Sequence, residues 1–439
     1  MNKVNFFWFR RDLRISDNAG LYHILKNEDN VIPLFIFDKS ILDKLEHEKD
    51  ARVEFIYDSI SELKKQLKAF GSDLMVKYGE PLEIWKDLLS AYEINSIYTN
   101  RDYEPYAEKR DSAIKELIEA EGGTFQSFKD HVIFETNEIL KSDGDPYVVF
   151  TPYMKKWLEK IDDGPSDFYL KSYPCEKYYA SFNKDIEFDL MKLEEMGFQR
   201  TDIEIPSKVI NQKTIKEYDE RRNFPALEGT SRLGVHFRFG TISIREKARK
   251  AWDLNKTYIS ELIWRDFYAQ ILAQFPHVAE RSFRIKYDAI EWRNNEEEFQ
   301  AWCEGRTGYK IVDAGMRELN NTGFMHNRVR MIVASFLTKH LLIDWRWGEA
   351  YFASKLLDYD LASNNGGWQW AAGSGTDAAP YFRIFNPYTQ VTKFDKDLKY
   401  INQWVPEHNT DSYPKEIVEH KAARERCLET YKKALAESN

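Results

Sequence analysis

Residues 358–370, which read DYDLASNNGGWQW, are the most informative stretch of this 439-residue chain. Two aspartates, two asparagines, two glycines and two tryptophans stand within thirteen residues, a composition that is not typical of a hydrophobic core. Gly366 and Gly367 permit the backbone to approach a ligand closely. The stretch therefore predicts a functional site, placed within a part of the chain whose pattern is helical.

Helical periodicity runs through the chain from about residue 201 onward. Ser243 and Glu246 form a capping box that opens one helix, and Thr322-Gly323 is a typical stop signal for another. The helices expected here span residues 243–252, 257–274, 309–321, 326–342 and 348–357.

Two of these helices carry unusual polar faces. Glu261, Trp264 and Arg265 stand at positions i, i+3 and i+4 and so share one face, although the same spacing fits a surface ion pair beside a half-buried tryptophan. Asn327 and Met331 share a side of the second helix. An amide can hydrogen-bond a base edge and a methionine can lie against a ring, but on its own this pattern indicates a solvated polar face.

The first 130 residues alternate between short apolar strands and amphipathic helices. The expected strands are residues 4–10, 31–37, 74–78, 96–99 and 124–128, and the expected helices are residues 19–26, 52–70, 81–92 and 106–121. This alternation predicts an α/β domain with a parallel, doubly wound sheet. No phosphate-binding glycine pattern follows the first strand, where residues 10–18 read RRDLRISDN, so an ordinary dinucleotide fingerprint is absent.

The chain is long enough for two domains. We predict an α/β domain over residues 1–130, a long interdomain linker over residues 131–200 and an all-α domain over residues 201–439. The linker is predicted from its weak periodicity and its many turn residues.

Composition indicates a soluble globular protein, with 43% hydrophobic and 31% charged residues. No apolar run approaches the ~20 residues that span a bilayer, and the N-terminus reads as a first strand rather than a signal peptide. The three cysteines lie far apart, which indicates neither a disulfide framework nor a metal site and favours free thiols in a reducing cytoplasm.

The formal net charge of −9 argues weakly against nucleic-acid binding, but the distribution of charge matters more. Between residues 221 and 250, eight basic side chains stand against two acidic ones, a local charge of +6. Taken alone, such a run is most simply a solvated helix face.

Several motifs together resemble the photolyase and cryptochrome family of flavoproteins, most closely its class I cyclobutane pyrimidine dimer photolyases. They are TSRLG at residues 230–234, ELIWR at 261–265, MHNR at 325–328, NNGGWQW at 364–370, TDAAPYFRIFNP at 376–387 and WFRRDLR at 8–14. The resemblance covers nearly the whole chain in order and is strongest between residues 218 and 390.

The resemblance implies that the helical domain binds FAD. The residues expected to hold its phosphates are Tyr218, Thr230, Ser231, Arg232, Leu233 and Gly234, and further contacts are expected from Tyr258, Arg265, Arg330, Asp358, Tyr359 and Asp360. Arg330 is the expected ion-pair partner of Asp358. Asn364 matches the residue that faces the flavin N5, where plant cryptochromes have Asp and insect ones Cys. An amide does not easily protonate N5, which suits the anionic reduced flavin that repair requires.

The resemblance also implies a pocket for a flipped-out pyrimidine dimer, formed by Glu261, Trp264, Asn327, Arg328, Met331 and Trp370. Glu261 would hydrogen-bond the dimer, and Arg222 and Gln390 match positions that contact DNA. Trp368, Trp345 and Trp292 match an electron-transfer chain that reduces the oxidised flavin. Trp252, Trp302 and Trp347 are interpreted as structural.

The implied function is light-driven repair of cyclobutane pyrimidine dimers in double-stranded DNA by a monomer that needs no protein partner. The alternatives are a cryptochrome-type blue-light receptor, which Asn364 and the absence of a long C-terminal tail disfavour, and a photolyase that prefers single strands. Folate-binding relatives carry an Asn-Glu pair where this chain reads Tyr106-Ala107. A folate, flavin or deazaflavin antenna and an empty antenna site therefore all stay open.

Overall fold

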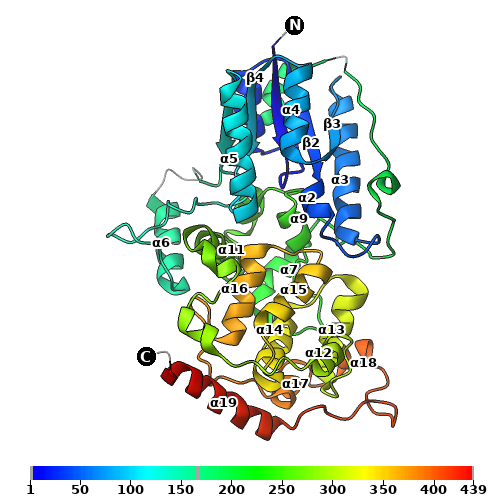
Figure 1. Ribbon diagram of the computed structural model, residues 1–439, viewed down its shortest axis with the longest axis vertical. Helices are drawn as coiled ribbons and strands as arrows, with labels where there is room; N and C mark the ends of the chain where they lie inside the picture. Colours follow the sequence, from blue (N-terminus) through cyan, green and yellow to red (C-terminus); the bar gives the residue numbers. More distant parts are fainter. Residues whose placement is uncertain (1–2, 164–168, 185, 438–439) are drawn as a thin grey trace. The chain divides into compact units, whose positions relative to one another are not determined.

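The computed structural model describes residues 3–163, 169–184 and 186–437, which form two compact units (Figure 1). The first unit comprises Met1–Glu138, Trp157–Lys208 and Leu233–Trp252. The second comprises Ile139–Lys156, Val209–Arg232 and Asp253–Asn439. Each unit is thus assembled from three separate stretches of the chain.

A five-stranded parallel sheet forms the centre of the first unit. Its strands are β1 (Val4–Phe9), β2 (Val31–Asp38), β3 (Met75–Gly79), β4 (Ile94–Asn100) and β5 (Thr124–Phe128), in the order β3-β2-β1-β4-β5. This is the parallel, doubly wound arrangement predicted from the sequence, and each strand overlaps its expected range.

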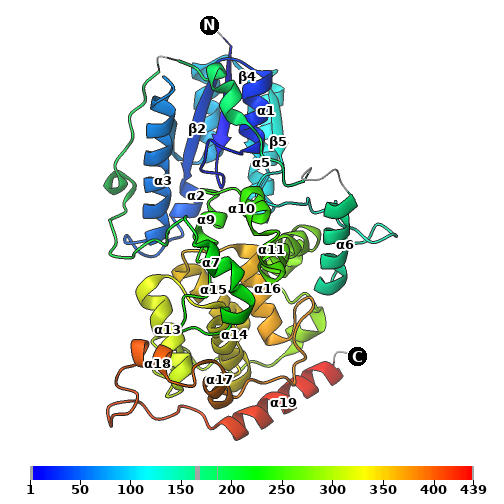
Figure 2. The same ribbon diagram turned by 180° about the vertical axis from the view of Figure 1, so that it is seen from behind.

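Helices cover both faces of this sheet (Figures 1 and 2). Side chains of β1 and β2 alternate between the faces, as the period of two in a strand requires. One set packs with α1 (Ala19–Asn27) and α3 (Ala51–Lys68), and the other packs with α4 (Pro81–Ala91) and α5 (Pro105–Ala120). The short helix α2 (Lys39–Leu42) follows β2 directly.

A buried charge network joins Leu233–Trp252 to the rest of the first unit. Ser243 caps α10 (Ile244–Ala251), and Arg245 from the first turn of this helix pairs with Asp17 at 3.0 Å and with Asp130 at 2.8 Å. Burial raises the pKa of Asp130, but the guanidinium groups of Arg14 and Arg245 outweigh burial and lower it to about 2. These ion pairs explain why a segment beyond residue 201 packs with the α/β unit. The preceding helix is α9 (Gly234–Arg238).

The second unit is helical around one large core. Its helices are α7 (Gln212–Lys216), α8 (Tyr218–Arg221), α11 (Lys256–Gln274), α12 (Glu296–Cys303), α13 (Lys310–Thr322), α14 (Asn327–Ser335), α15 (Trp345–Lys355), α16 (Leu361–Ala372), α17 (Pro387–Phe394), α18 (Lys399–Trp404) and α19 (His420–Glu437). The core is built mainly from α13, α14, α15 and α16. The helix expected over residues 326–342 changes at Ser335 into a π-helical segment, η5 (Phe336–Leu341), which ends at Leu342 in the left-handed conformation.

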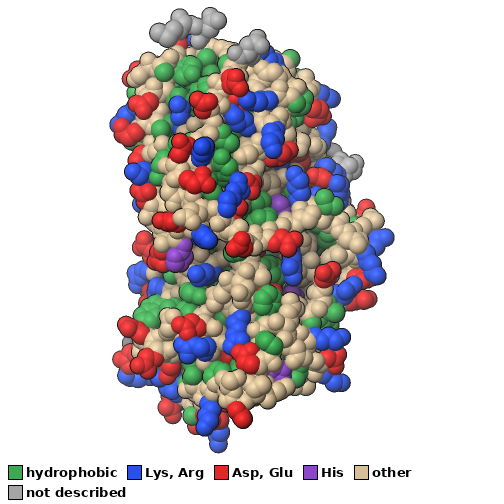
Figure 3. Space-filling view, turned by 90° about the vertical axis from the view of Figure 1, so that its right-hand side faces the viewer, with side chains coloured by type: hydrophobic (Ala, Val, Ile, Leu, Met, Phe, Trp, Pro, Cys, Tyr) green, Lys and Arg blue, Asp and Glu red, His purple; other side chains and the backbone are tan. Residues whose placement is uncertain are grey.

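The remaining connections contain α6 (Phe150–Asp163) and the short 3₁₀ turns η1 (Cys175–Ser181), η2 (Leu193–Met196), η3 (Pro276–Ala279) and η4 (Ile285–Ala289). Within residues 3–163, 169–184 and 186–437, no helix is both long and apolar enough to cross a membrane. Acidic and basic side chains are interspersed over the face drawn in Figure 3.

Candidate active site

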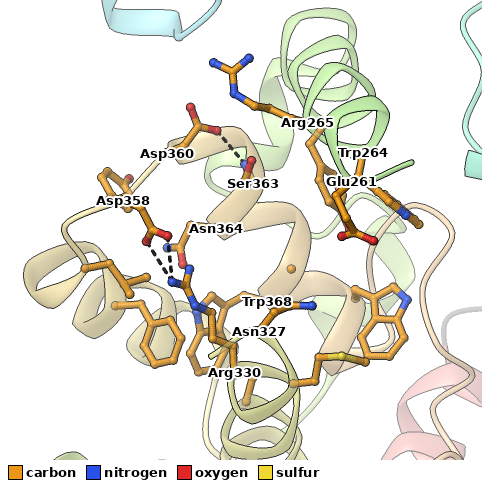
Figure 4. Close-up of a pocket in the computed structure, with 18 of the residues that line it drawn as sticks. Glu261, Trp264, Arg265, Asn327, Arg330, Asp358, Asp360, Ser363, Asn364 and Trp368 are labelled. Atoms are coloured by element: carbon orange, nitrogen blue, oxygen red, sulfur yellow. Dashed lines mark hydrogen bonds and ion pairs between the residues drawn. The ribbon is translucent and has the colours of Figure 1, made fainter. Parts of the chain in front are cut away.

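A cavity of about 420 Å³ lies within the second unit. It is enclosed by α11, α14, α15, α16 and the loop that precedes α16 (Figure 4). The predicted site residues that line it are Arg222, Glu261, Trp264, Arg265, Asn327, Arg330, Met331, Asp358, Tyr359, Asp360, Asn364, Trp368 and Trp370. Gly367, one of the two glycines noted in the sequence, also lines it, and the remaining lining residues were not predicted; these are Tyr268, Ala334, Phe352, Leu356 and Ser363.

One wall of the cavity is polar. Arg330 reaches from α14 to Asp358, with its Nη2 atom 3.0 and 2.9 Å from the two carboxylate oxygens, so the predicted ion pair is present. Arg330 Nε also donates to the carbonyl of Met325 at 2.7 Å. Asp360 caps the N-terminus of α16 by accepting a hydrogen bond from the backbone N–H of Ser363 at 3.0 Å. Two predicted acidic residues are therefore fixed in place before any ligand binds.

Asn364 lies one turn into α16, and its amide nitrogen is already engaged. The Nδ2 atom donates to Oε1 of Glu349 at 2.8 Å and to the carbonyl of the same residue at 3.1 Å. Burial raises the pKa of Glu349, while its hydrogen bond with Asn364 acts in the opposite direction. This orientation leaves the side-chain oxygen of Asn364 as its acceptor for an N–H group in the cavity.

The opposite wall is formed by α11 (Figure 4). Glu261, Trp264 and Arg265 all line the cavity, as their shared helical face predicted. Arg222 forms an ion pair with Glu261, in which the side chains are 23% and 29% exposed. Burial raises the pKa of Glu261, and Arg222 opposes this effect without cancelling it.

Aromatic rings complete the α11 wall. The ring of Tyr268 lies 5.3 Å from that of Trp264. A Cβ atom at Gly366 would stand 2.3 Å from the ring of Tyr268, so only glycine at this position of α16 allows α11 to approach so closely. The first of the two conspicuous glycines thus serves helix packing.

Comparisons with known proteins find the same family in the N-terminal and C-terminal parts of the chain. Residues 5–171 match the family described as DNA photolyase, and residues 258–411 match the family described as the FAD binding domain of DNA photolyase. The deoxyribodipyrimidine photo-lyases of Halobacterium salinarum and Escherichia coli are each 36% identical to this chain, over 98% of it and 99% of their own length. The chain belongs to the DNA photolyase family.

Solved structures of this family are similar over the whole chain. A bacterial class III photolyase from Agrobacterium tumefaciens superimposes with a TM-score of 0.87 and 33% identity, covering 99% of this chain and 98% of the relative. An archaeal photolyase from Sulfolobus tokodaii, described with two FAD molecules, gives a TM-score of 0.83 and 35% identity over 98% and 99% of the two chains.

The cavity has the chemistry that the FAD-binding domain of the DNA photolyase family requires. Phe352, Leu356 and Trp368 supply apolar surface for a flat ring, and the residues from Asp358 to Asn364 supply polar groups at its edge. A Cβ built on Gly367 meets no atom within 4 Å, so the second glycine faces open space. The residues present therefore fit FAD, which the family match identifies as the cofactor.

Some residues predicted to hold FAD lie outside this cavity. In the second unit, the ring of Tyr218 stands 5.2 Å from that of Tyr258, whose hydroxyl lies 3.3 Å from Oγ of Ser231. Arg232 adopts the left-handed conformation, with φ of 51°. Thr230 comes directly before Ser231 in the same unit, whereas Leu233 and Gly234 belong to the first unit.

Arg328, which was predicted to form part of the dimer pocket, and Gln390, which was predicted to contact DNA, lie outside the cavity lining. Arg328 donates from Nη2 to Asn223 at 2.6 Å and stacks over Phe394. Burial lowers the pKa of Arg328, and the nearby Arg222 lowers it further. Gln390 is a half-buried residue of α17.

The three tryptophans of the predicted electron-transfer chain share one hydrophobic cluster. Trp368 and Trp345 are buried within it, and the half-buried Trp292 packs against it. A Cβ at Gly348 would stand 2.1 Å from the ring of Trp368, so this glycine makes room for the innermost indole. The ring of Trp302, interpreted from the sequence as structural, lies 6.0 Å from Trp368.

Proposed function

We propose that this chain repairs cyclobutane pyrimidine dimers in DNA in a light-driven reaction. The observation that carries the proposal is the single cavity in which Glu261, Trp264 and Asn327 lie together with Asp358 and Asn364. The first set is suited to a damaged base and the second to a flavin. The curated relatives of similar length are named deoxyribodipyrimidine photo-lyase, which supports this substrate.

The α11 side of the cavity binds the substrate. An enzyme that acts on a base takes it out of the helical stack, and aromatic walls replace part of the lost stacking. Trp264 and Trp370 provide these walls, and Met331 provides a polarisable surface beside them. The amide of Asn327 hydrogen-bonds the pyrimidine edge.

Glu261 is the group that contacts the reacting bases. Burial raises the pKa of this carboxyl, and in its protonated form the carboxyl can donate a hydrogen bond to a dimer carbonyl as that carbonyl gains negative charge. In the structure Arg222 forms an ion pair with the same carboxyl group. Substrate binding therefore replaces an ion pair within the protein by a contact between Glu261 and the dimer, and frees Arg222 for a phosphate.

When bound, reduced FAD supplies the electron that splits the dimer after excitation by light. The contribution of the chain is to orient the ring and to control protons near it. Asn364, held by Glu349, presents an oxygen that cannot give up a proton, and Arg330 holds Asp358 in place through an ion pair. Trp368, Trp345 and Trp292 relay electrons from the surface when the cofactor is oxidised.

We assign double-stranded DNA as the substrate, contacted also by Gln390, and expect the protein to act as a monomer. A second flavin is one candidate antenna, since the Sulfolobus tokodaii relative is described with two FAD molecules. The number of flavins per chain in the purified protein tests this assignment, because a single equivalent excludes a flavin antenna.

The test is a repair assay on DNA that contains one cyclobutane thymine dimer, with reduced enzyme in blue light and in the dark. We expect light-dependent restoration of intact thymines, faster on duplex than on single strands. Glu261→Ala should lower the repair yield while FAD stays bound, whereas the exposed Glu297→Ala should have no effect. No repair by a protein with bound, photoreducible FAD would favour a blue-light receptor instead.

A further inference from the structure

Phe150 stacks on the tryptophan that forms one wall of the cavity. The ring centroids of Phe150 and Trp264 are 3.6 Å apart, and the two ring planes differ by 7°. Phe150 is the first residue of α6 and belongs, with Ile139–Lys156, to the second unit. One face of the Trp264 indole is therefore covered by a residue from a stretch that the sequence analysis assigned to the interdomain linker.

Two further contacts hold Phe150 in place. Its backbone N–H donates to Oδ2 of Asp377 at 3.2 Å, and the nearby carbonyl of Val148 accepts a hydrogen bond from Oγ1 of Thr376 at 2.6 Å. The ring also meets the edge of Phe267, with centroids 5.8 Å apart. The stacking partner of Trp264 is thus fixed to the loop that follows α16 and to α11 itself.

We propose that Phe150 is a positioning residue for substrate binding, which fixes the plane of Trp264 so that the indole is ready to receive an extruded pyrimidine dimer. This inference rests on the proposed function, because it takes Trp264 as a wall of the dimer pocket. The stack acts before binding. An indole that is already ordered does not have to lose rotational freedom when the dimer arrives.

The size of the effect follows from this ordering. Immobilising one large side chain on binding weakens affinity roughly 2- to 10-fold. Loss of the Phe150 ring should weaken dimer binding by this factor and leave binding of undamaged DNA unchanged, because only an extruded base reaches Trp264. If Phe150 served core packing alone, its loss would not weaken binding of dimer-containing DNA more than binding of undamaged DNA.

The test measures DNA affinity in the dark, so that no repair occurs during the measurement. FAD-loaded protein is titrated with duplexes that do or do not contain one thymine dimer. We expect Phe150→Leu to lower dimer affinity roughly 2- to 10-fold at unchanged affinity for undamaged DNA. Tyr153→Leu is the matched control, because Tyr153 is a buried ring of the same helix that packs on Phe267 rather than on Trp264. It should leave the preference for the dimer unchanged.

The same comparison in a Trp264→Ala background separates positioning from general packing. If Phe150 acts through Trp264, Phe150→Leu causes no further loss in that background. The inference would be overturned if Phe150→Leu lowered dimer affinity equally with and without Trp264→Ala. It would also be overturned if Trp264→Ala lowered dimer affinity but Phe150→Leu did not. If Trp264→Ala leaves dimer affinity unchanged, the proposed substrate pocket fails and the inference fails with it. Should Phe150→Leu not fold, Phe150→Met has a similar volume but an unbranched, more adaptable side chain and allows the same comparison.

Discussion

Replacing Arg222 by glutamine tests how the pocket stabilises the carboxyl group of Glu261. In the structure Arg222 pairs with Glu261, and about a quarter of each side chain is exposed to solvent. Glu261 is largely desolvated, and the replacement removes the charged partner that offsets this desolvation.

The expected coupling energy is about 1.5 kcal/mol at pH 8, the lower end for a hydrogen bond between charged groups, because both groups keep some solvent contact. Burial raises the pKa of Glu261 and Arg222 lowers it, so removing Arg222 raises this pKa further. The carboxyl then takes up a proton more readily, which limits the loss of stability. For the same reason the coupling should be smaller at pH 5 than at pH 8.

The assay is a double-mutant cycle in urea, with the unsubstituted protein, Arg222→Gln, Glu261→Gln and the double variant compared at both pH values. The exposed pair Lys433–Glu291 provides the control cycle, for which no measurable coupling is expected. A coupling below about 0.5 kcal/mol at pH 8, or a larger coupling at pH 5, would refute the reasoning, since both results mean that the contact does not stabilise an ionised carboxylate.

Further predictions concern Trp368, Glu349 and His326. Trp368→Phe should slow photoreduction of the oxidised flavin at least tenfold and leave repair by pre-reduced enzyme nearly intact; an equal fall in both would give Trp368 another role. Glu349→Ala frees the amide of Asn364, so it should lower repair yield several-fold, whereas Glu349→Gln keeps an acceptor and should retain most activity. Burial lowers the pKa of His326 to about 4, so the stability gained from its neutral form is present above pH 6.5 and is lost as the pH falls towards 4. His326→Asn keeps a side chain that can cap α14. In urea unfolding, this variant should lose about 2 kcal/mol less stability than the unsubstituted protein when the pH is lowered from 7 to 5. The control His277→Asn, at an exposed position, should not change this difference.

The sheet was predictable because short strand-like runs, the first two of them strongly apolar, alternate with helical patterns, and such periodicity is a local property. The ion pair between Arg330 and Asp358 was predictable only through the family resemblance, because 28 residues separate the two side chains. The cavity likewise brings together residues of three distant motifs, those at residues 261–265, 325–328 and 364–370.

The parts that the sequence did not reveal depend on contacts between distant segments. Phe150 lies in a stretch with weak periodicity, and nothing local marks it as the partner of Trp264. Arg245 belongs to the basic run between residues 221 and 250, yet it is buried between Asp17 and Asp130. A run of like charges in the sequence therefore does not define one surface.

The helix α16 sets limits on how this site can change. An α-helix advances about 1.5 Å and turns about 100° per residue, so Asn364 and Trp368 stand about one turn apart on nearly the same side, and Trp370 stands well around the axis from both. A substitution at any one of these positions alters only the contacts of that side chain. Insertion or deletion of a single residue between Asn364 and Trp368 would rotate Trp368 and every following side chain by about 100° relative to Asn364. The segment can therefore evolve by exchange of side chains, but hardly by a change of length.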